Sequence, residues 1–172
     1  LAQCICSKMD QFRKLARKRG FQNLLASPNV RVEKREGSGF SFPLHGYAEG
    51  VQSYAGAYQF RKHYYALPRD LKASGEEFHC AQAIDLHPAV KTWVRNVDRQ
   101  AGSFWLPTST DRFYPDFVVW LNDGRVLLVE YKGQHLLSSD DTREKRNVGA
   151  LWAGRGDGRG LHARLRGRAR AF

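Results

Sequence analysis

Residues 114–133, YPDFVVWLNDGRVLLVEYKG, decide the fold of this chain. Two runs of β-branched, aromatic and aliphatic residues flank Asn122-Asp123-Gly124, a pattern typical of a β-hairpin with a short turn. The outer ends of the two runs nevertheless carry acidic residues and a lysine, where a buried strand is expected to be apolar. Because local pattern and polarity conflict most often at functional sites, this hairpin is the first place to look for function.

The length of the turn decides whether those polar residues meet. In a three-residue turn Gly124 takes a left-handed conformation, Leu121 pairs with Arg125, and Asp116 lies opposite Glu130. Lys132 then follows on the same side of the sheet. A two-residue turn at Asp123-Gly124 would instead send the two acidic residues to opposite faces. The predicted site therefore depends on the three-residue turn.

Two carboxylates that close together repel each other unless a cation joins them. Mg²⁺, or Mn²⁺ in its place, is a hard cation that binds one or two carboxylates together with phosphate oxygens and water. Such a site suits phosphodiester hydrolysis. We therefore predict that Asp116, Glu130 and the backbone carbonyl of Tyr131 bind the metal, and that Lys132 serves the attacking water.

These residues resemble the PD-(D/E)xK nuclease signature, with Pro115-Asp116 followed after thirteen residues by Glu130-Tyr131-Lys132. The flanking sequence is similar to the C-terminal endonuclease domain of the restriction subunit of type III restriction enzymes and related helicase-nuclease proteins. The resemblance extends over roughly residues 54–153. It rests on FYPDF at 113–117, DGR at 123–125, VEYKG at 129–133, and the stretch from Asp141-Thr142 through EKR at 144–146 to Leu151-Trp152.

The resemblance implies an α/β fold with a restriction-endonuclease-like αβββαβ core, in which helices flank a mixed sheet. It implies a Mg²⁺-dependent DNA endonuclease with Asp116, Glu130 and Lys132 as catalytic residues. The expected partners are double-stranded DNA, a helicase/ATPase region of the same polypeptide or complex, and a methylating subunit that supplies specificity. It also implies a role in phage defence by restriction-modification. Three cysteines without a disulfide pattern favour reduced thiols in a cytoplasmic setting.

A Ser-x-x-Glu capping box at Ser74–Glu77 predicts a helix that runs to about Leu86. In the resembling fold the first core helix often carries an acidic residue that faces the metal, and Glu77 matches that position best. The alternative is that Glu77 only completes the cap, in which case Glu76 is the next candidate for a metal ligand.

Two further segments carry candidate DNA contacts. Residues 90–96 alternate as a strand, and Arg95 and Asn96 at its end are candidates for contact with DNA phosphates, although Arg95 is equally suited to pair with a carboxylate. A helix is expected from Asp140, Asp141 or Thr142 to about Ala153. Its Lys145 would face DNA or simply be solvated.

The sequence divides into three parts. Residues 1–53 are expected to connect the nuclease to a preceding domain, and their residues 10–19 read as a basic helix that Gly20 ends. Residues 54–166 would form the nuclease domain, with strands near 58–65 and 161–165 and a polar loop at 101–112. Residues 167–172 form a basic Gly/Arg tail that is expected to be disordered. The chain starts at Leu1, so we expect a fragment of a longer protein.

Charge is concentrated at the two ends of the chain. The excess of 28 Lys and Arg over 17 Asp and Glu is +11, of which residues 1–40 contribute +6 and residues 154–172 contribute +5. The alternative function is therefore an inactive nucleic-acid-binding module that binds through its basic ends. A third possible function is a domain that docks onto a motor partner.

Three cysteines without a Cys-x-x-Cys pair argue against a zinc site. No apolar run is long enough to predict a membrane span.

Overall fold

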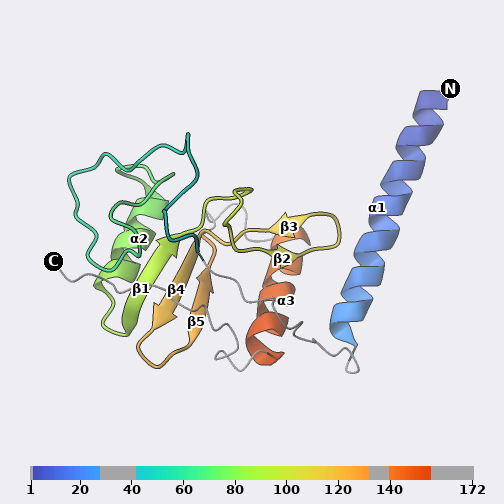
Figure 1. Ribbon diagram of the computed structural model, residues 1–172. Coiled ribbons are helices and arrows are strands. Elements are labelled where there is room, and N and C mark those ends of the chain that lie inside the picture. The colour runs from blue at the N-terminus through green and yellow to red at the C-terminus, as the bar shows by residue number, and fades with distance from the viewer. Residues whose placement is uncertain (1, 28–41, 132–139, 156–172) are drawn as a thin grey trace.

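A computed structural model describes residues 2–27, 42–131 and 140–155 of the chain (Figure 1). Within these ranges the polypeptide forms three helices and a small amount of antiparallel sheet. The elements in chain order are α1 (Ala2–Ala26), α2 (Glu76–Leu86), β1 (Val90–Arg95), β2 (Leu106–Pro107), β3 (Arg112–Phe113), β4 (Phe117–Leu121), β5 (Val126–Val129) and α3 (Asp140–Arg155).

The hairpin has the predicted three-residue turn. β4 pairs with β5 so that Phe117 lies opposite Val129 and Trp120 opposite Val126. The backbone N–H of Leu121 donates to the carbonyl of Arg125 at 2.9 Å, and Gly124 has a φ of 87°. Phe117 and Val129 form the outermost pair of this ladder, so the residues that adjoin them, Asp116 and Glu130, lie opposite each other. The predicted register is thereby confirmed.

β4 is the central strand of a three-stranded antiparallel sheet with the order β1-β4-β5. All but the last of its residues are buried, so both of its faces are covered. α2 covers one face, where Phe78 and Ala81 pack against Trp93, Phe117 and Val119. α3 covers the other face, where Val148 packs in a cluster with Val94, Val118, Trp120 and Val126. Figure 1 shows these two helices on opposite sides of the sheet.

β1 forms where the sequence predicts a strand, but its side chains do not alternate strictly. The register with β4 shifts between Val90 and Thr92. As a result Val90 and Trp93 belong to the cluster on the α2 side, whereas Val94 belongs to the α3 side. A bulge changes the face of every following residue by one position, and the sequence pattern carries no clear sign of it.

The aromatic segment near residues 58–65 does not form the expected strand of regular length. It runs beside β1 and makes only an isolated bridge, with Tyr64 N–H donating to Trp93 O at 2.8 Å and Trp93 N–H donating to Lys62 O at 3.0 Å. The ring of Phe60 packs edge-on against Trp93 and Tyr54, with centroids 5.2 Å apart in each case. These contacts place the ring in the core beside α2.

Two shorter segments also differ from the expectation. Residues 101–112 contain β2 and lead into β3, which pairs with it as a small arm instead of forming only a loop. Phe42 is buried in the cluster beneath α3, and residues 52–54 are hydrogen-bonded to residues 68–70. The folded unit therefore includes residues 42–53, which we expected to act as a connector.

α1 is longer than the helix predicted at residues 10–19, and the predicted end at Gly20 is wrong. Residues 2–26 are helical, and Phe21 and Leu25 beyond the glycine pack against the core cluster that contains Val148. A glycine inside a helix costs only about 1 kcal/mol relative to alanine, which contacts of this kind offset. Figure 1 shows the rest of α1 projecting away from the sheet.

From α2 to α3 the order of the core elements is helix, three strands, helix, as predicted, with the β2–β3 arm inserted. All described strand pairs are antiparallel. The expected strand at 161–165, which would make the sheet mixed, and the tail at 167–172 lie outside the described residues. Among the residues that the structure describes, no helix is both long and apolar enough to cross a membrane.

Candidate functional site

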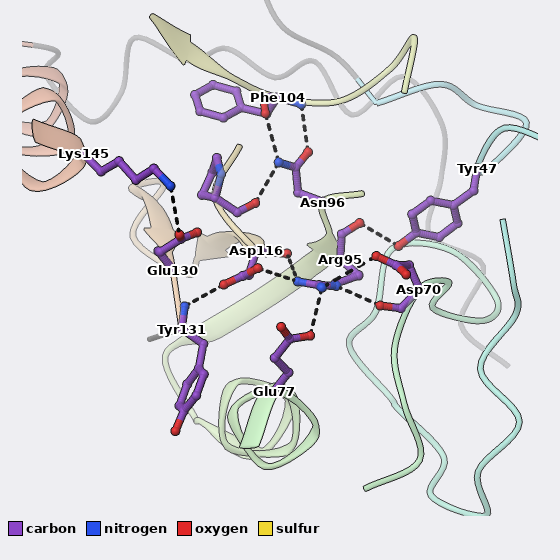
Figure 2. A network of polar contacts seen from close by, with 11 residues as sticks. Tyr47, Asp70, Glu77, Arg95, Asn96, Phe104, Asp116, Glu130, Tyr131 and Lys145 are labelled. Carbon is purple, nitrogen blue, oxygen red and sulfur yellow. Dashed lines mark hydrogen bonds and ion pairs between the residues drawn. The ribbon is translucent and has the colours of Figure 1, made fainter. Parts of the chain in front are cut away.

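The polar centre of the molecule is Arg95, the last residue of β1. Its guanidinium donates to Oε2 of Glu77 at 2.9 Å and to Oδ1 of Asp116 at 3.0 Å, and it lies 3.8 Å from Oδ2 of Asp70. Figure 2 shows the guanidinium between these three carboxylates, which come from the loop before α2, from α2 itself and from the start of β4. We call Asp70, Glu77, Arg95 and Asp116 the arginine cluster.

The Arg95 side chain is only 8% exposed, so its charge is taken almost completely out of water. A buried cation needs both opposite charges and hydrogen-bond acceptors. Arg95 also donates to the backbone carbonyls of Asp70 at 3.2 Å and of Asp116 at 3.1 Å, and its guanidinium lies 5.1 Å from the centre of the Phe117 ring. The sequence alternative in which Arg95 pairs with carboxylates is the one the structure shows.

Asp116 joins two strands as well as binding Arg95. Its Oδ2 accepts a hydrogen bond from the backbone N–H of Tyr131 at 2.7 Å, one residue beyond Glu130. Since Oδ1 of the same carboxylate is bonded to Arg95, both oxygens are engaged. The hairpin thus brings Asp116 beside the Glu130-Tyr131 step, as its register predicts.

Glu130 has a different cationic partner from Asp116. Its Oε1 lies 3.9 Å from Nζ of Lys145 on α3, and Nζ in turn lies 5.5 Å from the centre of the Phe113 ring. In Figure 2 the Glu130–Lys145 pair lies next to the arginine cluster, and Asp116 lies between Glu130 and Arg95. The predicted DNA contact Lys145 is thus placed at the site, where it offsets the charge of a predicted metal ligand.

Glu77 reaches the site without the predicted capping box. α2 begins at Glu76, Gly75 occupies the cap position with a φ of 99°, and no side-chain cap hydrogen bond forms. The capping-box prediction is wrong because the carboxylate of Glu77 turns to Arg95 instead. The neighbouring Glu76 interacts with Tyr131: desolvation and a hydrogen bond with Glu76 raise the pKa of the tyrosine hydroxyl.

Asn96, the other predicted phosphate contact on β1, is buried and bonded on all sides. Its amide donates to the carbonyls of Phe104 at 2.9 Å and Pro115 at 2.8 Å, and its Oδ1 accepts from the N–H of Phe104 at 2.8 Å. This side chain joins the strand ends to the segment before β2. It does not face solvent, where DNA would lie.

Clefts lie on both sides of this polar region. One, of ≈540 Å³, is lined by residues that include Gln52, Asp70, Glu77 and Arg95. The other, of ≈550 Å³, lies between β5 and α3, and its lining residues include Glu130, Tyr131, Lys145, Arg146 and Trp152. Glu77 and Arg95 therefore line one cleft, and Glu130 and Lys145 line the other.

The described residues do not offer a ready metal site. Nowhere in residues 2–27, 42–131 and 140–155 do three His, Cys, Asp or Glu side chains gather in a way that could hold a metal ion. Glu77 and Asp116, two of the predicted ligands, converge on a guanidinium. Lys132, the predicted catalytic lysine, lies outside the described residues.

The arginine cluster and the Glu130–Lys145 pair together carry more acidic than basic side chains. Asp70, Glu77, Asp116 and Glu130 contribute four negative charges, whereas Arg95 and Lys145 contribute two positive ones, which leaves a net charge of −2. Burial raises the pKa of the neighbouring Cys80 thiol, and the negative charge of Asp116 raises it further.

Asp70 is the member of the cluster that sequence reasoning missed. It has a φ of 52°, and its backbone N–H donates to the carbonyl of Gln52 at 2.8 Å. The only signal was the turn-like Pro68-Arg69-Asp70, which says nothing about contact with Arg95, twenty-five residues further along the chain.

Searches of protein-family models, curated proteins and solved structures find no match to this chain.

Proposed function

We propose that this chain is a metal-dependent DNA endonuclease domain of a restriction helicase-nuclease, which hydrolyses phosphodiester bonds. The observation that carries the proposal is the hydrogen bond from the N–H of Tyr131 to Oδ2 of Asp116 at 2.7 Å. It brings the acidic residue just before β4 to the Glu130-Tyr131 step that follows β5. This is the pairing that the sequence motif needs for its chemistry.

Each candidate residue would have a different role in the reaction. Asp116 and Glu130 supply the negative charge that recruits Mg²⁺ or Mn²⁺, and the bound ion would polarise the phosphate and its attacking water. Lys132 would serve that water. Lys145 and Arg146 line the cleft beside Glu130, where they would hold the DNA phosphates on either side of the scissile bond.

The proposed partners follow from the same resemblance. Double-stranded DNA would be the substrate, a helicase/ATPase region of the same polypeptide or complex would deliver it, and a methylating subunit would define where cleavage occurs. Among the described residues the arginine cluster does not form a metal site, because both carboxylate oxygens of Asp116 are engaged by Arg95 and by the N–H of Tyr131.

Cleavage of supercoiled plasmid in the presence of Mg²⁺ or Mn²⁺ tests the proposal directly. We expect Asp116→Ala and Lys132→Ala each to lower the cleavage rate by at least about a hundredfold, because both remove groups that act in the transition state. Asp98→Ala is the matched control, since Asp98 is an exposed carboxylate paired with Arg99. Full activity of both site variants would contradict the proposal.

The second candidate is a nucleic-acid-binding module without activity. It is favoured by α1, which carries six basic residues and one acidic residue and has no buried residue. This function predicts DNA binding that needs no metal and survives Asp116→Ala. The plasmid assay and a binding assay on the same samples therefore distinguish the two functions.

A further inference from the structure

Helix α1 carries an apolar stripe that is open to solvent. Ile5, Met9 and Phe12 follow one another at spacings of four and three residues, so they lie along one side of the helix, and Leu15 extends the stripe at one edge. These four residues are 52%, 49%, 69% and 52% exposed, in that order. No residue of α1 is buried by the part of the chain that the structure describes.

The stripe lies opposite the contact that attaches α1 to the rest of the molecule. Phe21 and Leu25 pack against the core cluster that contains Val148. At 3.6 residues a turn, these two residues lie about 160° to 200° around the helix from Ile5. Figure 1 shows the N-terminal part of α1 projecting away from the sheet. Packing among the described residues therefore does not account for the stripe, and an exposed apolar surface of this kind marks an interaction site.

Basic side chains flank the stripe. If Ile5, Met9 and Phe12 form the seam of a helix pair, Lys8 and Arg13 occupy the positions on either side of it, where ion pairs between helices form. The only acidic residue of α1 lies beside one of them, because Oδ1 of Asp10 is 3.6 Å from Nη1 of Arg13. A partner that covers the stripe therefore meets positive charge along both of its edges.

Charge argues against a second copy of this chain as that partner. In a parallel pair of α1 helices, Lys8 of one helix would face Arg13 of the other. In an antiparallel pair, the edge that carries Lys8 would face the same edge of the second helix. Both arrangements bring like charges together, which opposes association. The charge pattern therefore favours an acidic partner.

The width of the stripe favours a helix over a membrane surface as the partner. Ile5, Met9 and Phe12 span only about 60° of the helix circumference, and Lys8 interrupts this side of the helix before Leu15 is reached. A helix that packs on a broad apolar surface presents an apolar side about 100° wide or more, whereas a narrow seam is typical of contact between two helices. The occupant that fits is therefore a helix with an apolar seam of its own.

We propose that the apolar stripe of α1 binds an acidic amphipathic helix of a protein partner. Apolar side chains of that helix pack on the stripe, and its Asp or Glu side chains lie beside Lys8 and Arg13. This role goes beyond the proposed endonuclease function. It involves neither a metal ion nor the arginine cluster, so either proposal can fail without the other.

Fluorescence anisotropy with the full chain and two labelled synthetic helices tests the proposal. The acidic probe has leucine at the seam positions and glutamate beside them, and the basic probe has lysine in place of each glutamate. The acidic probe is expected to bind at least about tenfold more tightly than the basic one, because only its charges complement Lys8 and Arg13. No binding of the acidic probe, or equal binding of both probes, would overturn the proposal.

The stripe itself is tested by Met9→Gln combined with Phe12→Gln. Binding of the acidic probe is expected to weaken by at least about tenfold, because two apolar side chains no longer contribute burial. Glutamine is a good helix former, so circular dichroism is expected to show α1 retained. Leu24→Gln is the matched control: Leu24 is 53% exposed on the same helix but lies about 100° around it from Ile5. Its affinity is expected to stay within about twofold of the wild type, and an equal loss in both variants would overturn the stripe as the contact.

The flanking charges are tested by Lys8→Glu combined with Arg13→Glu. This variant is expected to prefer the basic probe over the acidic one, because the edges of the stripe now repel glutamate. Lys14→Glu combined with Arg17→Glu is the control, since it changes the net charge equally at positions about 180° and 120° around the helix from Ile5. The control is expected to keep the preference for the acidic probe. The same reversal in both variants would show attraction by net charge alone and would overturn the proposal.

Two further measurements on the same samples test the other occupants. Analytical ultracentrifugation is expected to show no self-association through the stripe. Self-association of the wild type that is lost in the Met9→Gln and Phe12→Gln variant would assign the stripe to a second copy and overturn the proposal. Binding to phosphatidylserine vesicles through the same two residues, without binding of the acidic probe, would assign the stripe to a membrane surface and overturn it equally.

Discussion

His63 illustrates how a single residue can make stability depend on pH. The ring is half-buried beside Trp93, with its Nδ1 2.9 Å from the carbonyl of Tyr65 and its Nε2 3.0 Å from the hydroxyl of Tyr47. Burial lowers the pKa of His63 from 6.5 to about 4. The same kind of desolvation raises the pKa of Tyr47. The folded protein therefore keeps both groups neutral at neutral pH.

The sign of the pH effect follows from the lowered pKa of His63. Between about pH 6.5 and pH 4 the unfolded chain binds a proton that the folded chain does not, so the free energy of unfolding falls as pH falls through this window. The expected loss is about 3 kcal/mol, and it is complete below the folded pKa. Urea unfolding at pH 7 and pH 4 measures it, and His63→Gln is expected to remove that part of the pH dependence. A variant with the wild-type pH profile would contradict the assignment.

At the scale of elements, two glycines allow the hairpin and α3 to be compared by the same substitution. Gly124 in the turn has a φ of 87°, and a methyl group added there would meet no atom within 4 Å. Gly149 in α3 also has open space for a methyl group, but it lies inside a helix. The two sites therefore differ in backbone conformation and not in available room.

We expect opposite effects on the free energy of unfolding. Gly124→Ala should lower it by about 1 kcal/mol or more, because alanine resists a positive φ. Gly149→Ala should raise it by about 0.5–1 kcal/mol, because alanine is the better helix former. Chemical denaturation of the two variants gives both values. A stabilising Gly124→Ala would show that the turn is not the three-residue type on which the register of Asp116 and Glu130 depends.

At the scale of the whole molecule, we propose separate tasks for the acidic centre and for the basic helix α1. The arginine cluster with Glu130 and Lys145 is negative, whereas α1 has a net charge of +5 from six basic residues and Asp10. Such a distribution suits a protein that holds a polyanion at its periphery and a cation at its centre. α1 projects from the sheet in Figure 1, so its basic side chains are open to a long nucleic acid.

Salt dependence of DNA binding tests this division. Replacing Arg13, Lys14 and Arg17 by alanine is expected to reduce the slope of log K against log salt by about 2 to 3, because each phosphate contact contributes about 0.9 for duplex DNA. Fluorescence anisotropy at several salt concentrations measures the slope. Asp116→Ala is the control that should leave it unchanged within about 1. An unaltered slope in the triple variant would place the DNA contacts elsewhere.

Local patterns predicted those elements whose causes lie within a short stretch of sequence. The hairpin follows from two apolar runs and a turn that needs Gly124, and α3 follows from polar residues before a periodic helix. Contacts between distant residues were beyond such patterns. Asp85 is the example: it is buried, and it accepts hydrogen bonds from the N–H groups of Arg61 and Lys62 and from Nε1 of Trp93. No feature of its own helix indicates these partners.

The same distinction between local patterns and contacts between distant residues applies to the candidate site. By itself the sequence determined the hairpin and, given a three-residue turn, the meeting of Asp116 with the Glu130-Tyr131 step, because side-chain alternation is a local property; the structure decided between the two turn lengths. Only the tertiary structure decided that Arg95 lies among Asp70, Glu77 and Asp116, because a buried guanidinium takes whichever carboxylates the packed helix, loop and strand bring to it.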